Sequence, residues 1–286
     1  MDPRFAQLPQ SLRSQAVSVR LAGVPALVAH PDEGWVGGAA PTPRPVMIWM
    51  HGRTVNKELD PGRYLRWIRA GIAAVALDLP GHGERFEEGM QGSDRTLEIV
   101  TRMASELDAV VQSLGEARWQ GCFDTLRVGV GGMSAGGMAT LIRLCSPHRF
   151  TCAAVESTAG DFEMMSRFTA FYTRGGRDPS GSMAFMNNPA RRLDAWRPIP
   201  LLSLHSEADE WVPVQAMRSF CVSLRERYQA LGANPALVEL RTWETTGAPN
   251  EHAGFGRVAS EAKDEQLRFL SAHLLGPPAA ASKGAE

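Results

Sequence analysis

The chain has 286 residues, enough for one large domain or two small ones with a substantial buried core. Lys and Arg number 30 against 31 for Asp and Glu, and this formal charge of −1 offers no basic surplus for binding nucleic acid. No apolar run approaches the roughly 18 residues of a membrane helix, and the first residues lack the apolar stretch of a secretory signal. We therefore expect a cytoplasmic protein with neither a nucleic-acid nor a membrane partner.

The predicted strands begin with an antiparallel hairpin, in which residues 16–21 and 25–30 flank Ala22-Gly23-Val24. A loop rich in Gly and Pro follows at 34–45. From Val46 onward, short apolar runs alternate with amphipathic stretches, which is typical of a mainly parallel sheet covered by helices on both faces. The predicted strands of this part are 46–50, 72–77, 126–131, 152–155, 200–204 and 237–243.

The predicted helices lie between these strands. Apolar residues recur at steps of three and four from Leu97 to Leu114 and from Met217 to Leu231. A further helix is expected over 257–275, and residues 276–286 form a small, polar tail that we expect to be disordered. Because no repeat or composition break divides the chain, residues 1–275 are expected to form a single domain.

One segment interrupts the alternation of strands and helices. About forty residues separate the strands 152–155 and 200–204, which is more than one crossover helix normally needs. Met and aromatic residues are frequent in this stretch, and they can repack around varied ligands. We predict that residues 160–198 form a small helical cap over an apolar pocket. The alternative is an added helical hairpin whose aromatic side chains only pack it against the rest of the domain.

The pattern with the clearest chemical meaning is Gly132-Met133-Ser134-Ala135-Gly136, directly after a predicted strand and before a helix of small and apolar residues. This is GxSxG in its strand–turn–helix setting, which indicates a nucleophilic serine. The flanking glycines allow a tight turn that exposes the hydroxyl. The backbone N–H of Ala135, at the start of the helix, is placed to donate to an oxyanion.

A serine hydroxyl needs a base, and the base needs an acid that orients it. Among seven histidines, His252 lies in a Gly-flanked loop after the last predicted strand, where loops line the ligand crevice of such sheets. Asp209 follows the strand 200–204 and is our predicted acid. The other acids that could take this role are Glu207, Glu210 and Asp161.

The order Ser134, Asp209, His252 resembles the α/β-hydrolase superfamily. Three further stretches between residues 46 and 275 agree with this resemblance: Met50-His51-Gly52-Arg53-Thr54 is similar to the HG turn, residues 78–85 resemble the D-x-PGHG turn, and residues 205–213 resemble the acid loop. The chain looks most like bacterial carboxylesterases of the dienelactone-hydrolase and prolyl-oligopeptidase-like branch. Dienelactone hydrolases proper use a cysteine nucleophile, where this chain has Ser134.

The resemblance implies an α/β fold of the α/β-hydrolase type, with about eight strands in a mainly parallel sheet, helices on both faces and a small cap. It also implies an oxyanion hole formed by the backbone N–H groups of Arg53 and Ala135. The Arg53 side chain replaces a residue that is often hydrophobic, and we expect it to approach a substrate carboxylate or to pair with Glu84. His51 and His82 are expected to have structural roles in their turns.

The sequence therefore predicts a serine carboxylesterase that acts on small-molecule esters through an acyl-enzyme. A peptidase, amidase or thioesterase with the same triad is the alternative, and a non-catalytic binding protein is a remote one. About 45 residues precede the predicted core, whereas peptidases of this branch usually carry a large N-terminal propeller. The predicted substrate pocket comprises Met133, Trp211, Phe255, Phe168, Phe171 and Met186.

No cofactor or metal is expected, because the chain contains no HExxH motif, no Cys/His ligand cluster and no Gly-rich phosphate-binding loop. Its four cysteines show no CxxC spacing, and we expect reduced, packed thiols. The sequence leaves the natural ester and the oligomeric state open.

Overall fold

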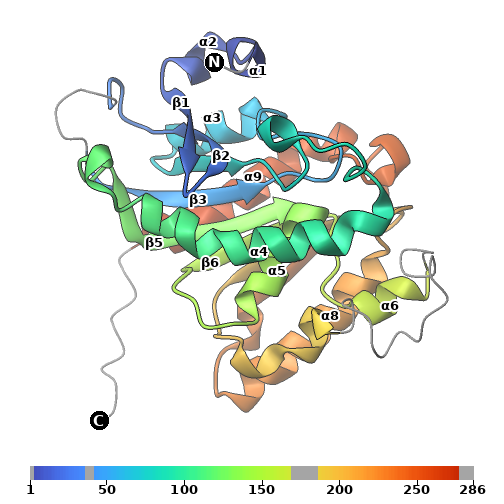
Figure 1. Ribbon diagram of the computed structural model, residues 1–286. Helices are drawn as coiled ribbons and strands as arrows, with labels where there is room; N and C mark the ends of the chain where they lie inside the picture. The colour runs from blue at the N-terminus through green and yellow to red at the C-terminus, as the bar shows by residue number, and fades with distance from the viewer. Residues whose placement is uncertain (1–2, 36–41, 169–185, 277–286) are drawn as a thin grey trace.

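The protein is described here from a computed structural model, which covers residues 3–35, 42–168 and 186–276 (Figure 1). Its centre is an eight-stranded sheet in the order β1-β2-β4-β3-β5-β6-β7-β8. The strands are β1 Ala16–Leu21, β2 Val24–Ala29, β3 Arg44–Met50, β4 Ala73–Leu77, β5 Phe123–Met133, β6 Cys152–Glu156, β7 Leu201–Ser206 and β8 Val238–Trp243. The pairs β1–β2 and β2–β4 are antiparallel, and all other pairs are parallel.

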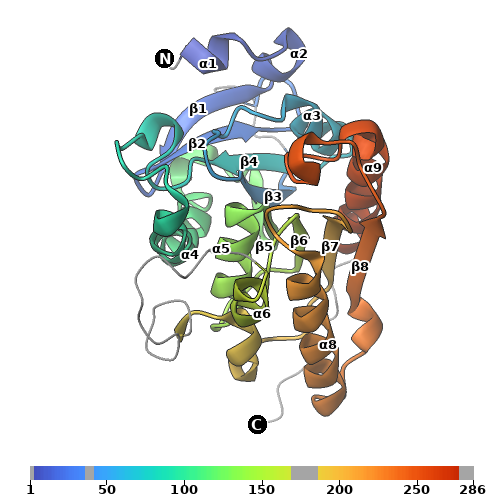
Figure 2. The ribbon, with the colours of Figure 1, turned by 90° about the vertical axis from the view of Figure 1, so that its right-hand side faces the viewer.

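Helices cover both faces of the sheet, as Figure 2 shows. One apolar cluster joins the sheet to α4, α5 and α8, and a second joins it to α2, α3 and α9. The α-helices are α1 Pro3–Ala6, α2 Gln10–Arg13, α3 Pro61–Arg69, α4 Thr96–Ser113, α5 Ala135–Leu144, α6 Phe162–Ser166, α8 Val214–Ala230 and α9 Ala259–Leu270. Because both faces are covered, β4 and β6 are buried along their whole length, which explains the apolar sequence of β4 and of β6 up to Val155.

The structure differs from the sequence prediction at the ends of elements and in the helices α1, α2 and α3, which are not among the predicted helices. Strand β5 reaches Met133, so it includes the first two residues of the GxSxG motif. The helix expected over 257–275 is divided into a 3₁₀ turn, Gly256–Val258, then α9, and a π-helical turn, Ser271–Leu275. In the predicted cap, α6 and the 3₁₀ turns Pro189–Arg191 and Leu193–Ala195 are described, while 169–185 lie outside the described residues. So does the predicted tail beyond Gly276.

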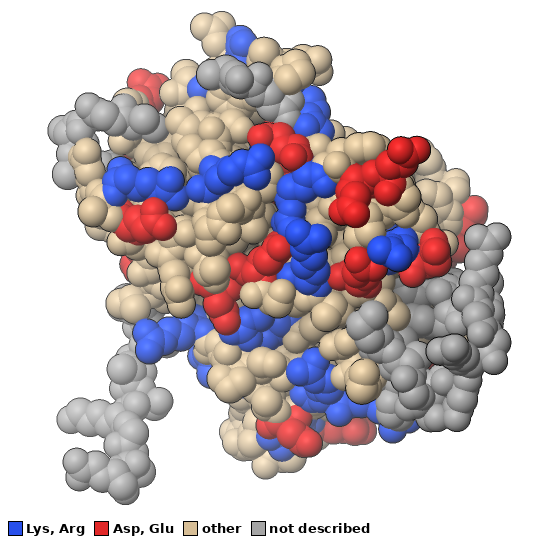
Figure 3. Space-filling model, viewed as in Figure 1, with Lys and Arg blue, Asp and Glu red and all other residues tan. Residues whose placement is uncertain are grey.

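Charged side chains of both signs are interspersed over the face shown in Figure 3, in keeping with the near-neutral composition. All four cysteines are buried and free of disulfides. Within the described ranges, no helix has both the length and the apolar character needed to cross a bilayer.

Candidate active site

Ser134 occupies a strained turn between β5 and α5. Its φ of 51° and ψ of −115° lie in a region that residues other than glycine rarely adopt. The turn is held by backbone hydrogen bonds on both sides: the N–H of Ser134 donates to the Glu156 carbonyl at 2.8 Å, and its carbonyl accepts from Met138 N–H at 2.9 Å. These bonds fix the serine at the carboxyl end of β5.

The glycines of the motif bring the turn against the end of β3. A Cβ atom on Gly136 would lie 2.2 Å from the Met50 carbonyl oxygen, and one on Gly132 would lie 2.6 Å from the same atom. A side chain at either position would therefore push the two backbones apart. In the existing packing, a Cβ on Gly52 would lie 3.5 Å from the Cβ of Ser134, so the turn after β3 is directly beside the serine.

Ser134, His252 and Asp209 lie in one hydrogen-bonded row. The Oγ of Ser134 is 3.0 Å from Nε2 of His252, and Nδ1 of His252 is 2.8 Å from Oδ2 of Asp209. His252 and Asp209 are buried, whereas Ser134 is partly accessible. Because the carboxylate accepts from Nδ1–H, Nε2 carries the lone pair that faces the hydroxyl. This geometry allows the imidazole to take the serine proton.

The acid is held by several donors. Asp209 Oδ1 accepts the backbone N–H groups of Trp211 at 2.9 Å and Val212 at 2.8 Å, and Nε2 of the buried His205 lies 3.3 Å from Oδ2. Burial alone would raise the pKa of Asp209, but the hydrogen bonds from His205 and His252 outweigh it and lower the pKa. The group therefore stays ionised beside His252.

The competing acids have other partners. Asp161 caps α6 and accepts the hydroxyl of Ser219 at 2.7 Å. Glu207 forms an ion pair with Arg218, and Glu210 is exposed. Of the four acids considered from the sequence, Asp209 is therefore the one that the structure brings to His252.

Glu251 shapes the loop that carries His252. Its carboxylate accepts the backbone N–H groups of Thr246 and Gly247, at 2.5 and 2.7 Å, and the hydroxyl of Ser206 at 2.8 Å. The Thr246 backbone hydrogen bond is the main cause that lowers the pKa of Glu251 to about 2. Sequence reasoning missed this residue, although an acid next to a histidine in a Gly-flanked turn could have suggested it.

His51 orients the peptide between Gly52 and Arg53. Its Nε2 accepts the backbone N–H of Leu79 at 3.1 Å, so the imidazole proton is on Nδ1, which donates to the Gly52 carbonyl. The N–H of the same peptide group is that of Arg53. Among the hydrogen bonds of the described residues, none occupies the backbone N–H of Arg53 or that of Ala135. Both donors are therefore available beside Ser134.

The Arg53 side chain does not pair with Glu84, which corrects one of our two expectations. Glu84 accepts instead from the buried Lys57, at 2.6 Å. Lys57 also contacts Asp78 at 3.1 Å and Glu58 at 2.8 Å. This group of charges holds Glu84 away from Arg53, because the buried Lys57 ammonium would be very costly without carboxylate partners.

A cavity of about 530 Å³ opens beside the serine. Met133 and Trp211 line it, and the indole of Trp211 lies 5.0 Å from the His252 ring. Phe255 does not line it: the ring is buried in the core and packs on Trp243 at 5.3 Å, because the chain turns inward after the His252 loop. Phe168 and Met186 are exposed and lie outside its lining, and Phe171 is outside the described residues.

The wall of this cavity contains a charged network that sequence reasoning missed. Arg63, in α3, donates to both carboxylate oxygens of Glu156 at 2.6 and 2.8 Å and to Asp60 at 3.1 Å. Asp60 also accepts from Lys263 of α9 at 2.8 Å. The available signal was an acid, Glu156, directly after the predicted strand 152–155, but its partners lie far away in the chain.

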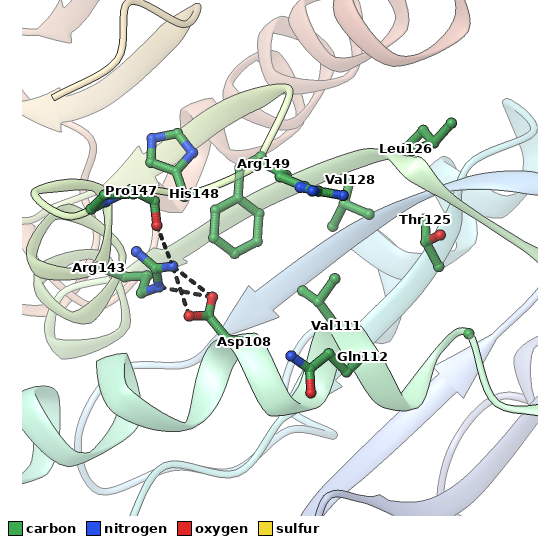
Figure 4. Close-up of a pocket in the computed structure, with 12 residues that line it drawn as sticks. Asp108, Val111, Gln112, Thr125, Leu126, Val128, Arg143, Pro147, His148 and Arg149 are labelled. Atoms are coloured by element: carbon green, nitrogen blue, oxygen red, sulfur yellow. Dashed lines mark hydrogen bonds and ion pairs between the residues drawn. The ribbon is translucent and has the colours of Figure 1, made fainter. Parts of the chain in front are cut away.

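A second hollow of about 690 Å³ lies at the amino ends of β5 and β6, opposite Ser134 (Figure 4). The ion pair of Arg143 with Asp108, at 2.7 Å, spans one side of it. Its histidine, His148, has no hydrogen-bond partner for either ring nitrogen among the described residues. Nor do these residues contain a group of three metal-ligating side chains. The hollow therefore lacks the hydroxyl–imidazole–carboxylate arrangement of the first site.

Known proteins resemble the chain over most of its length. It is 24% identical over 267 residues to esterase YjfP of Escherichia coli, covering 90% of this chain and 98% of that protein. A puromycin-hydrolyzing peptidase of Mycobacterium tuberculosis superposes with a TM-score of 0.72 at 20% identity, covering 97% of this chain. The chain spans only 41% of that peptidase. Thermogutta terrifontis esterase 2 gives a TM-score of 0.62 at 17% identity, over 92% of this chain and 97% of that one.

These likenesses and the strand order confirm the predicted α/β-hydrolase fold. The sequence also matches the prolyl oligopeptidase family over residues 65–273, which is more than half of the chain. This match includes the GxSxG turn, the acid loop and the His252 loop. The chain therefore belongs to the prolyl oligopeptidase family and is a serine hydrolase.

Proposed function

We propose that the protein is a carboxylesterase that cleaves small-molecule esters through an acyl-enzyme on Ser134. The observation that carries the proposal is the row of hydrogen bonds, 3.0 Å from Ser134 to His252 and 2.8 Å from His252 to Asp209. The likeness to esterase YjfP over nearly its whole length supports an ester as the substrate. The proposal includes a cytoplasmic location, for which the four unbonded cysteines are the support.

In the first half of the reaction, Ser134 Oγ attacks the ester carbonyl carbon while Nε2 of His252 takes the hydroxyl proton. The backbone N–H groups of Arg53 and Ala135 stabilise the oxyanion that forms. When the tetrahedral intermediate collapses, the bond to the alkoxy oxygen breaks. His252 gives its proton to that oxygen, and the alcohol leaves.

In the second half, a water molecule attacks the acyl carbon and gives a proton to His252. The bond to Oγ breaks, Ser134 regains its proton, and the carboxylic acid leaves. Asp209 remains ionised throughout and stabilises the imidazolium in both halves. These steps use no cofactor.

A peptidase or amidase is the second candidate. The specific observation in its favour is membership of the prolyl oligopeptidase family, together with the fold likeness to the mycobacterial peptidase. A thioesterase would use the same residues, because all three reactions pass through an acyl-serine.

The test compares wild type with Ser134→Ala on 4-nitrophenyl butyrate, a butyryl thioester and an aminoacyl 4-nitroanilide. We expect the ester to be the best substrate by kcat/KM, and Ser134→Ala to reduce its turnover by at least 10⁴-fold, as loss of a triad nucleophile does. Anilide turnover above ester turnover would favour the peptidase. Undiminished turnover by Ser134→Ala would remove this residue from the mechanism.

A further inference from the structure

The cavity beside Ser134 has more cationic than anionic side chains in its described lining. Arg53, Arg63 and Lys263 line it, against the carboxylates of Asp60 and Glu156. Its volume of about 530 Å³ is within the range of ligand pockets, about 300–1,000 Å³. A substrate placed against Ser134 therefore lies in a cavity whose wall includes these five side chains.

Four of the five charges balance one another. The guanidinium of Arg63 joins Glu156 and Asp60, and Lys263 adds a second cation to Asp60 at 2.8 Å. Gln266 donates to Oε1 of Glu156 at 3.0 Å and supplies a further contact for Arg63. Both carboxylates are thus already hydrogen-bonded, which leaves the wall little capacity to attract a cationic substrate.

Arg53 is the unbalanced charge. Its guanidinium donates to the backbone carbonyl of Gln91 at 3.0 Å. Among the described residues it forms no ion pair within 4.0 Å, and the one acid whose charge raises its pKa, Asp94, acts from farther away. A guanidinium has five N–H donors, so most of its donors are available to a ligand. Burial lowers the pKa of Arg53, which reflects the incomplete solvation of this cation. An anion beside the Arg53 guanidinium would compensate for the water contacts that this cation lacks.

Lys263 offers a second donor group in the same cavity. Its ammonium has three donors, and its hydrogen bond to Asp60 uses one of them. The side chain is about one-fifth exposed, so the ammonium is accessible from the cavity without being fully solvated. Arg53 belongs to the turn after β3 and Lys263 to α9, so the two cations enter the cavity from different elements.

We propose that the ester cleaved at Ser134 carries a carboxylate, which Arg53 and Lys263 bind in this cavity. The inference rests on the proposed function and adds the substrate class to it. A carboxylate is planar and accepts two parallel N–H donors, which suits a guanidinium, and an ammonium adds a point charge. The neutral and cationic analogues of the same ester lack this interaction.

The test uses two ethyl esters of nearly equal shape: monoethyl adipate, which has a terminal carboxylate, and ethyl adipamate, which has a carboxamide instead. Ethanol release gives kcat/KM for each. We expect wild type to prefer the carboxylate by about tenfold or more, the scale of a hydrogen-bonded charge. Calorimetric titration with adipate and adipamide makes the same comparison without turnover.

Arg53→Gln and Lys263→Gln each remove one cation, and both variants are expected to lower the preference at least threefold. The double variant should bring the ratio of the two kcat/KM values close to one. Arg66→Gln is the matched control, because it removes a cation between α3 and α9 that pairs with Asp264 outside the cavity. Thermal melting of each variant verifies that it is folded.

The outcomes separate the two proposals. If wild type cleaves ethyl adipamate as well as or better than monoethyl adipate, the carboxylate proposal is overturned and the esterase proposal stands. A preference that survives in both variants also overturns it, since other groups would then bind the anion. If neither adipate ester is cleaved but 4-nitrophenyl butyrate is, the esterase proposal stands, and equal calorimetric binding of adipate and adipamide overturns the carboxylate proposal. If 4-nitrophenyl butyrate is not cleaved either, the esterase proposal fails, and the calorimetric comparison alone decides on the carboxylate.

Discussion

At the scale of the residue, the candidate site depends on which nitrogen of each histidine carries the proton. His252 donates from Nδ1 to Asp209 and presents Nε2 to the serine. His51 donates from Nδ1 to the Gly52 carbonyl, because its Nε2 accepts from Leu79. The first histidine is placed to act on the proton, and the second sets the direction of a peptide group. The same side chain thus serves two different purposes within one site.

We predict that His51→Ala lowers kcat on 4-nitrophenyl butyrate by about 10²-fold with little change in KM. Losing one oxyanion donor typically costs 10²–10³-fold, and without His51 the Arg53 N–H loses its fixed direction. Steady-state kinetics measures the effect.

His273→Gln is the control for this variant, because His273 packs on Phe269 in the last helical turn. That variant should retain kcat. A His51→Ala enzyme with kcat within twofold of wild type would show that the Arg53 N–H does not need this histidine.

At the scale of the element, the loop that presents His252 is fastened by Glu251. Asn250 and Glu251 both have positive φ, at 54° and 51°, a conformation that Asn tolerates but that Glu rarely adopts. The carboxylate compensates by accepting hydrogen bonds from Thr246, Gly247 and Ser206. The position of His252 is therefore coupled to the ionisation of the neighbouring Glu251.

The pKa of Glu251 falls to about 2 in the folded state from an ordinary value of 4.5. A lowered folded-state pKa contributes stability that is present above pH 4.5 and lost as the pH falls from there toward 2. We predict that Glu251→Gln lowers Tm at pH 7 by about 2–4 °C, the effect of about 1 kcal/mol in a protein of this size. The difference from wild type should shrink at pH 3.5, as measured by calorimetry.

Glu244→Gln, at an exposed acid in the same segment, should leave Tm nearly unchanged at both pH values. A Glu251→Gln deficit of equal size at pH 7 and pH 3.5 would contradict the role of the carboxylate.

The sequence predicted most elements but not their ends. Apolar runs identified the strands because a sheet covered on both faces requires them. The extension of β5 to Met133 depends instead on pairing with the neighbouring strands, of Gly132 with Met50 and of Met133 with Glu156, which the spacing of apolar residues cannot reveal. The π-helical turn Ser271–Leu275 likewise falls within a stretch whose apolar spacing resembles an ordinary helix.

At the scale of the whole molecule, the network of Arg63, Glu156 and Gln266 joins three separate elements, α3, β6 and α9. Arg63 also stacks over Trp49, with its guanidinium carbon 4.3 Å from the ring centroid. Burial alone would lower the pKa of Arg63, but Glu156 and Asp60 raise it, so the guanidinium remains charged within the protein. The network therefore links α3 and α9, which cover one face of the sheet, to the wall of the cavity.

We predict that Glu156→Ala lowers the free energy of unfolding by about 3 kcal/mol, because it removes one partner of a buried ion pair. Urea denaturation monitored by tryptophan fluorescence measures this change. Asp264→Ala, which breaks the more exposed pair with Arg66 between α3 and α9, should cost at most about 1 kcal/mol. Equal costs for the two variants would refute the structural role of the buried pair.

The candidate triad could be predicted from the sequence, whereas this network could not. Ser134, Asp209 and His252 each follow a recognisable strand, and their order in the chain matches a known pattern. The partners of Arg63 lie 93 and 203 positions away, on elements that carry no motif. Only the folded arrangement reveals that they meet.

The distance along the chain between Ser134 and His252 has a consequence for how the protein is made. The ribosome synthesises the serine 118 residues before the histidine. A nascent or truncated chain can thus display its hydroxyl while lacking the imidazole that would activate it. In an incomplete chain the Ser134 hydroxyl is not activated as a nucleophile. We expect this activation only after β8 and the loop that follows it have joined the sheet.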